Sequence, residues 1–140
     1  MKKFFAVCLS LCLAIALCAV PAFADGDVAQ VEDDSTYPTL QAAIDAVSDS
    51  GKVTLLKDTA EDITIASEKT IELVLNAKLT NVSGHTIVVK NGGNLTISGS
   101  GTVDNITHQR AAIDNEIGGV VVLNGGTFTR SAETGASPTQ

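Results

Sequence analysis

The sequence contains no tryptophan and only one tyrosine, Tyr37, among its 140 residues. Many sites that bind sugars or single-stranded nucleic acids use flat aromatic rings as stacking surfaces, and the sequence offers no set of rings for such a surface. Lysine and arginine are also few, and they form no basic stripe that could neutralise phosphates. We therefore expect no nucleic-acid partner and no attraction to an anionic membrane surface.

Cysteine is absent from residues 25–140, because Cys8, Cys12 and Cys18 all lie in the first segment of the chain. That segment has a positively charged start, an apolar stretch and the ending Ala-Phe-Ala, the layout of a cleaved secretory signal peptide. We predict cleavage after Ala24 and a secreted or cell-surface location, with no membrane segment in the processed chain. The processed chain has no thiol, which excludes disulfides, thiolate metal sites and cysteine nucleophiles.

Positive charge is scarce in the processed chain, where seven basic residues face sixteen acidic ones, a net charge of −9. Residues 25–50 hold seven of the acids and no base. Residues 25–36 lack a periodic apolar face and are predicted to be a solvated acidic leader. Its acids Glu32, Asp33 and Asp34 match no calcium-loop spacing. We predict no metal site and no cofactor.

The stretch TYPTLQAAIDAVSDSG, residues 36–51, has the apolar spacing of a helix. Four apolar residues recur at intervals of three and four and share one face: Leu40, Ala43, Ile44 and Val47. Thr39 is the expected N-cap, and Gly51 is the expected stop of a helix of about three turns. Such a one-sided helix must pack its apolar face on another element.

From Lys52 onward, short apolar runs with a period of two replace the helical spacing, and turn-forming residues separate them. The runs predict strands at residues 53–56, 63–65, 70–75, 86–89, 95–97 and 120–123. The inward-facing positions are expected to be Val53, Leu55, Ile63, Ile65, Ile71, Leu73, Leu75, Ile87, Val89, Leu95, Ile97, Val121 and Leu123.

Three segments share one pattern of apolar residues followed by Asn or Ser and a small residue: LVLNAKL, LTISGSGTV and VVLNGGTF. The equivalent positions are Leu55, Leu75, Ile97 and Leu123, which recur with a period of roughly 20 to 26 residues. A repeat of this length with several short strands per period predicts a solenoid whose coils bury one apolar column. A sandwich or barrel of hairpins would also show frequent turns and stays open as an alternative.

The stretch LTISGSGTVDN, residues 95–105, raises the question of a phosphate-binding loop, because its glycines follow an apolar run. A phosphate loop needs a helix N-terminus directly after its glycines. Here the sequence Thr-Val-Asp follows, which is typical of a strand, and the third glycine of the dinucleotide motif is missing. We predict that the glycines occupy a corner between two strands, aligned with Gly125 and Gly126 of the next repeat.

Taken in order, five segments of the chain form a series that is typical of a known family: YPTLQAAIDAV, GKVTLLKDTAEDITI, TIELVLNAKLT, GHTIVVKNGGNLTISGSGTVDN and AAIDNEIGGVVVLNGGTFT. The series resembles the pectin-lyase-like right-handed parallel β-helix, as repeated in exported bacterial surface proteins. The resemblance implies an all-β right-handed parallel β-helix of about three to four coils with a short N-terminal capping helix. The chain then divides into the signal peptide 1–24, the leader 25–36, the β-helix domain 37–130 and a polar tail 131–140.

This superfamily includes polysaccharide lyases and glycoside hydrolases, so the resemblance directs attention to catalytic groups. Hydrolysis of a glycosidic bond generally needs two facing carboxylates, and a lyase would combine calcium-binding acids with a basic residue. The candidates are Asp104, Asp114 and Glu116, with His108 and Arg110 in the loop between them. The competing interpretation is that the acids form turns and the loop is a solvated insertion. We favour it and predict no catalytic residue, whereas convergence of two of these side chains in one groove would favour an enzyme.

Two further motifs have a structural interpretation. His85 directly precedes an expected strand and has no acidic pair near it in sequence, so it is predicted to be a corner residue. Asn81, Asn94 and Asn105 begin N-glycosylation patterns of the form Asn-x-Ser/Thr. The signal peptide looks bacterial, and polar turns of a β-solenoid produce such matches by chance, so we expect the patterns to be incidental.

The residues after Arg130, SAETGASPTQ, are polar and supply no apolar face for the last coil. An uncovered coil is a template for edge pairing. We expect this tail, another subunit through self-association, or further coils of a longer, truncated chain to cover it.

The sequence favours a secreted or cell-surface β-helix module without catalysis, structural or adhesive in role. An extracellular polysaccharide or a surface protein is its expected partner. The rival hypothesis is a small or degenerate carbohydrate-active enzyme.

Overall fold

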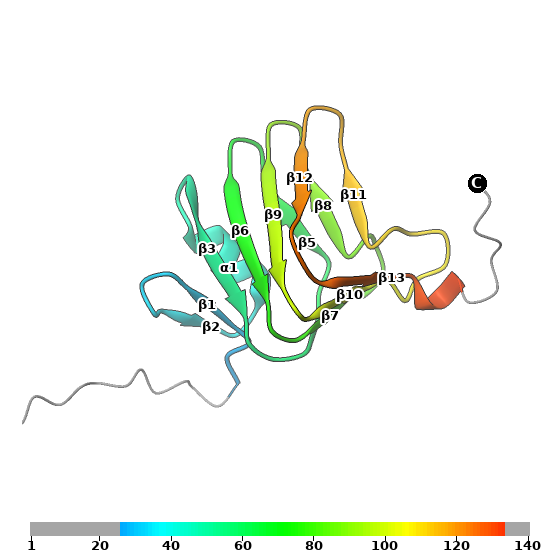
Figure 1. The fold of residues 1–140 in the computed structure, drawn as a ribbon, viewed down its shortest axis with the longest axis horizontal. Coiled ribbons are helices and arrows are strands. Elements are labelled where there is room, and N and C mark those ends of the chain that lie inside the picture. Colours follow the sequence, from blue (N-terminus) through cyan, green and yellow to red (C-terminus); the bar gives the residue numbers. More distant parts are fainter. Residues whose placement is uncertain (1–25, 134–140) are drawn as a thin grey trace, which may run out of the picture.

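The computed structural model describes residues 26–133, whose fold is shown in Figure 1. The N-terminal elements are β1 (Ala29–Val31), β2 (Thr36–Tyr37) and α1 (Leu40–Ala46). Coil 1 comprises β3 (Ser50–Leu55), β4 (Thr59–Ala60) and β5 (Ile63–Ile65), and coil 2 comprises β6 (Thr70–Leu75), β7 (Lys78–Thr80) and β8 (Ile87–Val89). Coil 3 comprises β9 (Asn94–Gly99), β10 (Thr102–Asp104) and β11 (Ile113–Asn115). The incomplete coil 4 comprises β12 (Val120–Leu123) and β13 (Thr127–Thr129), followed by the 3₁₀ turn η1 (Ser131–Glu133).

Strands of successive coils pair in parallel and form three sheets, with strand orders β12-β9-β6-β3-β1-β2, β13-β10-β7-β4 and β11-β8-β5. The pairings made by β1 are antiparallel. The predicted parallel β-helix is thus confirmed as a parallel β-solenoid of about three turns with one short helix. The alternative of a sandwich or a barrel of hairpins is wrong.

The pairing register differs from the predicted repeat at one step. Leu55 lies opposite Leu75, and Ile97 lies opposite Leu123, as expected. Between them, however, Ile97 pairs with Leu73, and Leu75 lies opposite Gly99. The predicted alignment of Leu75 with Ile97 is therefore wrong by two positions. A shift of two leaves every side chain on the same face of the sheet, so the apolar pattern could not distinguish the two registers.

One apolar column runs through the coils. The predicted inward positions from Val53 to Ile97 are buried, at 1% exposure or less. Leu79 and Val103 of the second sheet are also fully buried. The last two predicted core positions differ, because Val121 is half-buried and Leu123 is 51% exposed. They occupy inward positions of coil 4, but no described residue stacks on them.

Helix α1 covers the N-terminal end of the column (Figure 1), with the predicted apolar face buried against coil 1. Thr39 is the N-cap, and its hydroxyl accepts a hydrogen bond from the amide of Ala42 at 3.1 Å. The predicted stop is wrong, because the helix ends at Ala46 with Val47 extended. Gly51 already belongs to β3, where an added Cβ would lie 3.0 Å from the Val47 side chain. The helix is therefore shorter than the three turns expected.

The acidic leader is partly folded, which corrects the prediction that it is solvated throughout. Residues 29–31 form β1, which pairs with the outer edge of β3, and Ala29 is fully buried. The acids Glu32, Asp33 and Asp34 lie exposed in the turn between β1 and β2. Acidic residues flank this short strand on both sides, so its apolar alternation was too short to be recognised in the sequence.

The glycines of SGSG form a corner between β9 and β10, as predicted, and a strand rather than a helix follows them. A Cβ at Gly99 would lie 2.3 Å from the carbonyl oxygen of Leu75, and one at Gly101 would lie 2.2 Å from that of Ala77. Gly125 stacks on Gly99 in the next coil. The glycines are needed because the backbones of neighbouring coils approach too closely for a side chain.

Within residues 26–133, no helix is long and apolar enough to cross a membrane. The predicted signal peptide and most of the polar tail lie outside the described residues.

Candidate functional site

The coils differ in length mainly at one corner, between the second sheet and the third. The loop at this corner spans residues 61–62 in coil 1, 81–86 in coil 2 and 105–112 in coil 3, so it lengthens from coil to coil. Loops of variable length on a rigid scaffold are where binding and catalytic residues concentrate. We call this set of three loops the polar corner and treat it as the candidate site.

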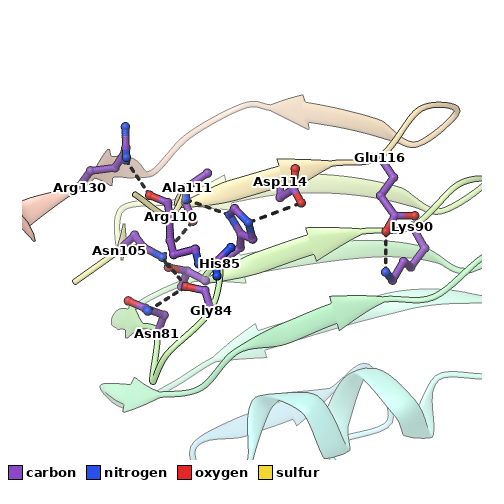
Figure 2. A network of polar contacts seen from close by, with 11 residues as sticks. Asn81, Gly84, His85, Lys90, Asn105, Arg110, Ala111, Asp114, Glu116 and Arg130 are labelled. Atoms are coloured by element: carbon purple, nitrogen blue, oxygen red, sulfur yellow. Dashed lines mark hydrogen bonds and ion pairs between the residues drawn. The ribbon is translucent and has the colours of Figure 1, made fainter. Parts of the chain in front are cut away.

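Asparagines at matching positions form the inner layer of the polar corner (Figure 2). Asn81 and Asn105 follow the paired residues Thr80 and Asp104, and both are fully buried. The Asn81 amide donates to the carbonyl of Gly84 at 2.9 Å, and its oxygen accepts from the amide of Ile106 in the next coil at 2.6 Å. These bonds satisfy backbone groups that a tight loop would otherwise leave without a partner.

Asn105 repeats this role one coil further. Its side-chain amide donates to the carbonyls of Gly84 and Ala111, both at 3.0 Å, and to the hydroxyl of Thr86 at 3.1 Å. Its side-chain oxygen accepts from the amide of Thr107 at 3.0 Å. Each asparagine therefore joins its own loop to that of a neighbouring coil.

Asp62 is the acid of the polar corner in coil 1. Its carboxylate accepts hydrogen bonds from the amides of Val82, Ser83 and Gly84 in coil 2, the shortest at 2.8 Å. Partial burial raises the pKa of Asp62, but these backbone donors outweigh that effect and hold the pKa below its ordinary value. Asp62 was not singled out in the sequence, and it holds the loop of coil 2 on coil 1.

Asp104 lies at the end of β10 and is 3% exposed. Its carboxylate contacts the Lys78 ammonium at 3.0 Å and accepts from the amide of Ser131 at 3.0 Å. Burial raises the pKa of Asp104, but hydrogen bonds from Ser131, Thr129 and Lys78 overcome it and lower the pKa to about 2. Asp104 is thus an ionised side chain that joins coils 2, 3 and 4.

Asp114 of β11 lies beside His85 of the polar corner (Figure 2). One carboxylate oxygen lies 3.8 Å from His85 Nε2. His85 Nδ1 accepts a hydrogen bond from the amide of Ala111 at 2.9 Å. Because Nδ1 accepts this bond, its lone pair is already used, and Nε2 is the ring nitrogen that can donate. His85 is therefore held as a corner residue, and it differs from the prediction only in having an acid beside it in space.

Glu116 pairs with Lys90 of the preceding coil at 2.5 Å, away from the other candidates (Figure 2). The hydrogen bond from Lys90 lowers the pKa of Glu116 from its ordinary value. His108 and Arg110 lie exposed in loop 105–112. The Arg110 carbonyl accepts a hydrogen bond from Arg130 Nε at 2.7 Å, which ties this loop to coil 4.

The ion-pair partners of the three candidate acids determine what these acids can do chemically. Asp104, Asp114 and Glu116 each contact a different basic side chain: Lys78, His85 and Lys90, respectively. In the described part of the chain, no group of three or more His, Cys, Asp or Glu side chains could hold a metal ion.

The most important residues that the sequence interpretation missed are the two buried asparagines. The signal was present as Asn81-Val-Ser83 and Asn105-Ile-Thr107, two similar tripeptides one coil apart. The number of residues that separates the two tripeptides equals the offset at which β7 pairs with β10, since Thr80 lies opposite Asp104. What resembled a glycosylation pattern is therefore the repeat of a buried hydrogen-bonding position.

A surface hollow of about 250 Å³ lies at the N-terminal end of the stack, near the turn between β1 and β2. Val31, Glu32, Tyr37, Val47 and Lys52 contribute to its lining. None of the candidate residues of the polar corner lines this hollow.

Comparison with protein-family models, curated proteins and solved structures gave no match for this chain.

Proposed function

We propose that this chain is an exported β-helix module of the pectin-lyase-like kind, with a structural or adhesive role outside the cell and no catalysis. The observation that carries the proposal is the use of the polar corner. Asn81, Asn105 and Asp62 bond the backbone of neighbouring coils, and Asp104 joins three coils. These side chains serve the scaffold rather than an open site.

The geometry of the acids supports the same proposal. A glycosidase places two carboxylates on either side of the bond that it cleaves, about 5 to 10 Å apart and open to the sugar. Asp104 is almost fully buried under Lys78 and Ser131, so a sugar could not reach its oxygens without displacing coil contacts. A general base also needs a free lone pair, and His85 Nδ1 is bonded to a backbone amide.

An extracellular polysaccharide or a surface protein is the proposed partner, and the outer faces of the coils are the proposed contact surface. Outward positions on the first sheet carry polar side chains such as Thr54, Glu72 and Thr96 in adjacent coils. Such a flat, regularly spaced face suits an extended polymer better than a small molecule, because it offers repeated contacts rather than one enclosed pocket.

The test is to incubate the exported protein with pectins, glucans and host glycans, and to measure both binding and the release of fragments. We expect binding without cleavage of any polymer. Cleavage that disappears in Asp104→Ala or Arg110→Ala would contradict the proposal and favour the rival carbohydrate-active enzyme. Mass spectrometry of the same sample checks export, since the proposal expects an N-terminus at Asp25.

The rival function has one observation in its favour. Loop 105–112 carries His108 and Arg110 at the surface, and its Ala111 binds the same His85 that faces Asp114. A degenerate enzyme would use this neighbourhood. In that case Asp114→Asn would abolish cleavage while leaving the thermal melting temperature unchanged, a combination that the structural role does not predict.

A further inference from the structure

We propose that two copies of this chain pair through their C-terminal coils and form a closed, two-fold symmetric dimer. The proposal concerns assembly, and it holds whether or not the module binds a glycan.

The apolar column is exposed at its C-terminal end. The inward positions Ile113, Val121 and Phe128 continue the buried column but are only half-buried, and Leu123 is 51% exposed. One coil earlier, the paired side chains are all buried: Ile87, Leu95, Ile97 and Val103. Among the described residues nothing covers this end, so the last rung exposes the same kind of surface that holds the other coils together.

The second step is the backbone edge. The amides of Val120 and Asn124 donate to carbonyls of coil 3, so β12 directs alternate amides toward its neighbour. The amides of Val121 and Leu123 then point away from coil 3, toward the open side. A strand edge with directed donors and acceptors is a template for another strand. The edge strands β11, β12 and β13 contain no lysine or proline, the residues that commonly block such pairing.

The third step is that the opposite end of the molecule is closed to the same contact. Strand β1 pairs with the outer edge of β3, and α1 packs over coil 1. The open coil of one copy therefore cannot stack on the N-terminal end of another and propagate a filament. An open end can only meet an open end, which gives an isologous contact that closes after two copies.

Charge and size both allow this contact. A two-fold axis brings residues close to their own copies, so a charged face would repel itself. Residues 117–129, which include β12 and β13, contain no charged side chain, and the charges of the open end are Asp114, Glu116, Arg130 and Glu133. The open end runs from β11 through η1. A stretch of that length falls within the roughly 20 to 30 residues that each side of a standard stable interface contributes.

The test is the mass of the exported, processed chain in solution, measured by light scattering during gel filtration over a range of concentrations. We expect a dimer. Leu123→Lys places one charge from each copy on the same face, so it should halve the mass while leaving the circular dichroism spectrum unchanged. Val82→Lys is the matched control, because Val82 is an exposed apolar residue in the loop of coil 2 and should keep the dimer. A monomeric native chain, a dimeric Leu123→Lys variant, or a filament would each overturn the proposal.

A second measurement keeps the proposal testable if the lysine variant fails to fold. The processed chain has no cysteine, so a single introduced thiol reports directly on a two-fold contact. At least one of Val120→Cys, Val122→Cys and Leu123→Cys should form a disulfide-linked dimer on mild oxidation, whereas Val82→Cys should not. Absence of cross-linking at all three positions would contradict end-to-end pairing.

Discussion

At Gly99 and at Gly101, the absence of a side chain allows two coils to stack. Gly99 has φ +92°, a backbone conformation that L side chains rarely adopt, and its position for a Cβ is already filled by the Leu75 backbone. The corner thus combines a conformational reason and a steric reason for glycine. Neither of these two reasons for glycine involves a bound phosphate.

Gly99→Ala should therefore be strongly destabilising. We expect a loss of roughly 3 kcal/mol or more, since the left-handed conformation costs about 1 kcal/mol and the overlap with the Leu75 carbonyl forces the coils apart. Urea unfolding measures the change. Gly92→Ala is the control, because Gly92 has φ +81° but its nearest neighbour would lie 3.7 Å from the new Cβ. It should lose only about 1 kcal/mol, and equal losses in the two variants would refute the steric part of the explanation.

Asp104 should contribute to stability in a pH-dependent way. Its pKa is lowered in the folded chain from the ordinary 3.8 to about 2, so the contribution is fully present above about pH 4 and disappears as the pH falls through 2. Asp104→Asn should lower the free energy of unfolding by about 1 to 2 kcal/mol at neutral pH. The difference from the native chain should shrink between pH 4 and pH 2, as followed by urea unfolding at several pH values. A difference that stays constant over this range would contradict the ionised, bonded role.

The buried asparagines show which single residues the sequence could and could not predict. The sequence neighbours of His85 indicate a corner residue, and His85 lies in the loop between β7 and β8. The prediction that Asp104 and Asp114 form turns is wrong, because they belong to β10 and β11. The partners of Asn81 and Asn105 lie far along the chain in other coils, and only the register reveals them. The polar corner was therefore predictable as a loop, whereas its hydrogen bonds were not.

The strands that the coils contribute to the first sheet, β3, β6, β9 and β12, follow directly from the sequence, because each has two or more inward apolar residues at a period of two. The other two strands of this sheet, β1 and β2, were not predicted. The runs at 70–75 and 120–123 coincide with β6 and β12. In the second sheet only β10 was predicted, from the sequence Thr-Val-Asp after the glycines, whereas β4, β7 and β13 were missed. The missed strands are two or three residues long and have at most one inward apolar residue each, such as Leu79 or Phe128. A single apolar residue has no period, so such a strand is visible only through its neighbours in the stack.

Helix α1 is held by side chains from the coils rather than by a glycine at its C-terminus. Glu61 accepts hydrogen bonds from the first-turn amides of Leu40 and Gln41, and Lys69 Nζ donates to the carbonyls of Ile44 and Val47 at its other end. A carboxylate at the N-terminus and a cation at the C-terminus both complement the helix dipole. This explains why so short a helix is stable without Gly51 as its stop.

Lys69→Met should loosen this cap, because methionine keeps the apolar stem and removes the charge and the donors. We expect a loss of about 1 kcal/mol and faster amide exchange within residues 40–46. Lys90→Met is the matched control, since Lys90 is about half-exposed and pairs only with an exposed acid, and its loss should be close to zero. Unchanged exchange in α1 of Lys69→Met would show that burial of its apolar face alone secures the helix.

The molecule as a whole is a stack with two different ends. A solenoid is stabilised by contacts between neighbouring repeats, so its terminal coils are the least stable unless something covers them. Here β1 and α1 cover coil 1, while coil 4 has a neighbour on one side only within the described residues. The open end was predicted from the polar sequence after Arg130, but its apolar and uncharged character became clear only once the inward positions were known.

Amide hydrogen exchange tests this account most directly, measured on the processed chain at a dilution where it is monomeric. Exchange should be slowest in β6 and β9, which lie between two neighbours, slow in β3 beneath the N-terminal cap, and fastest in β12 and β13. Such a gradient from the middle of the stack to its open end would confirm a capped solenoid with an uncovered last coil. Protection of β12 equal to that of β6 in the monomer would contradict it.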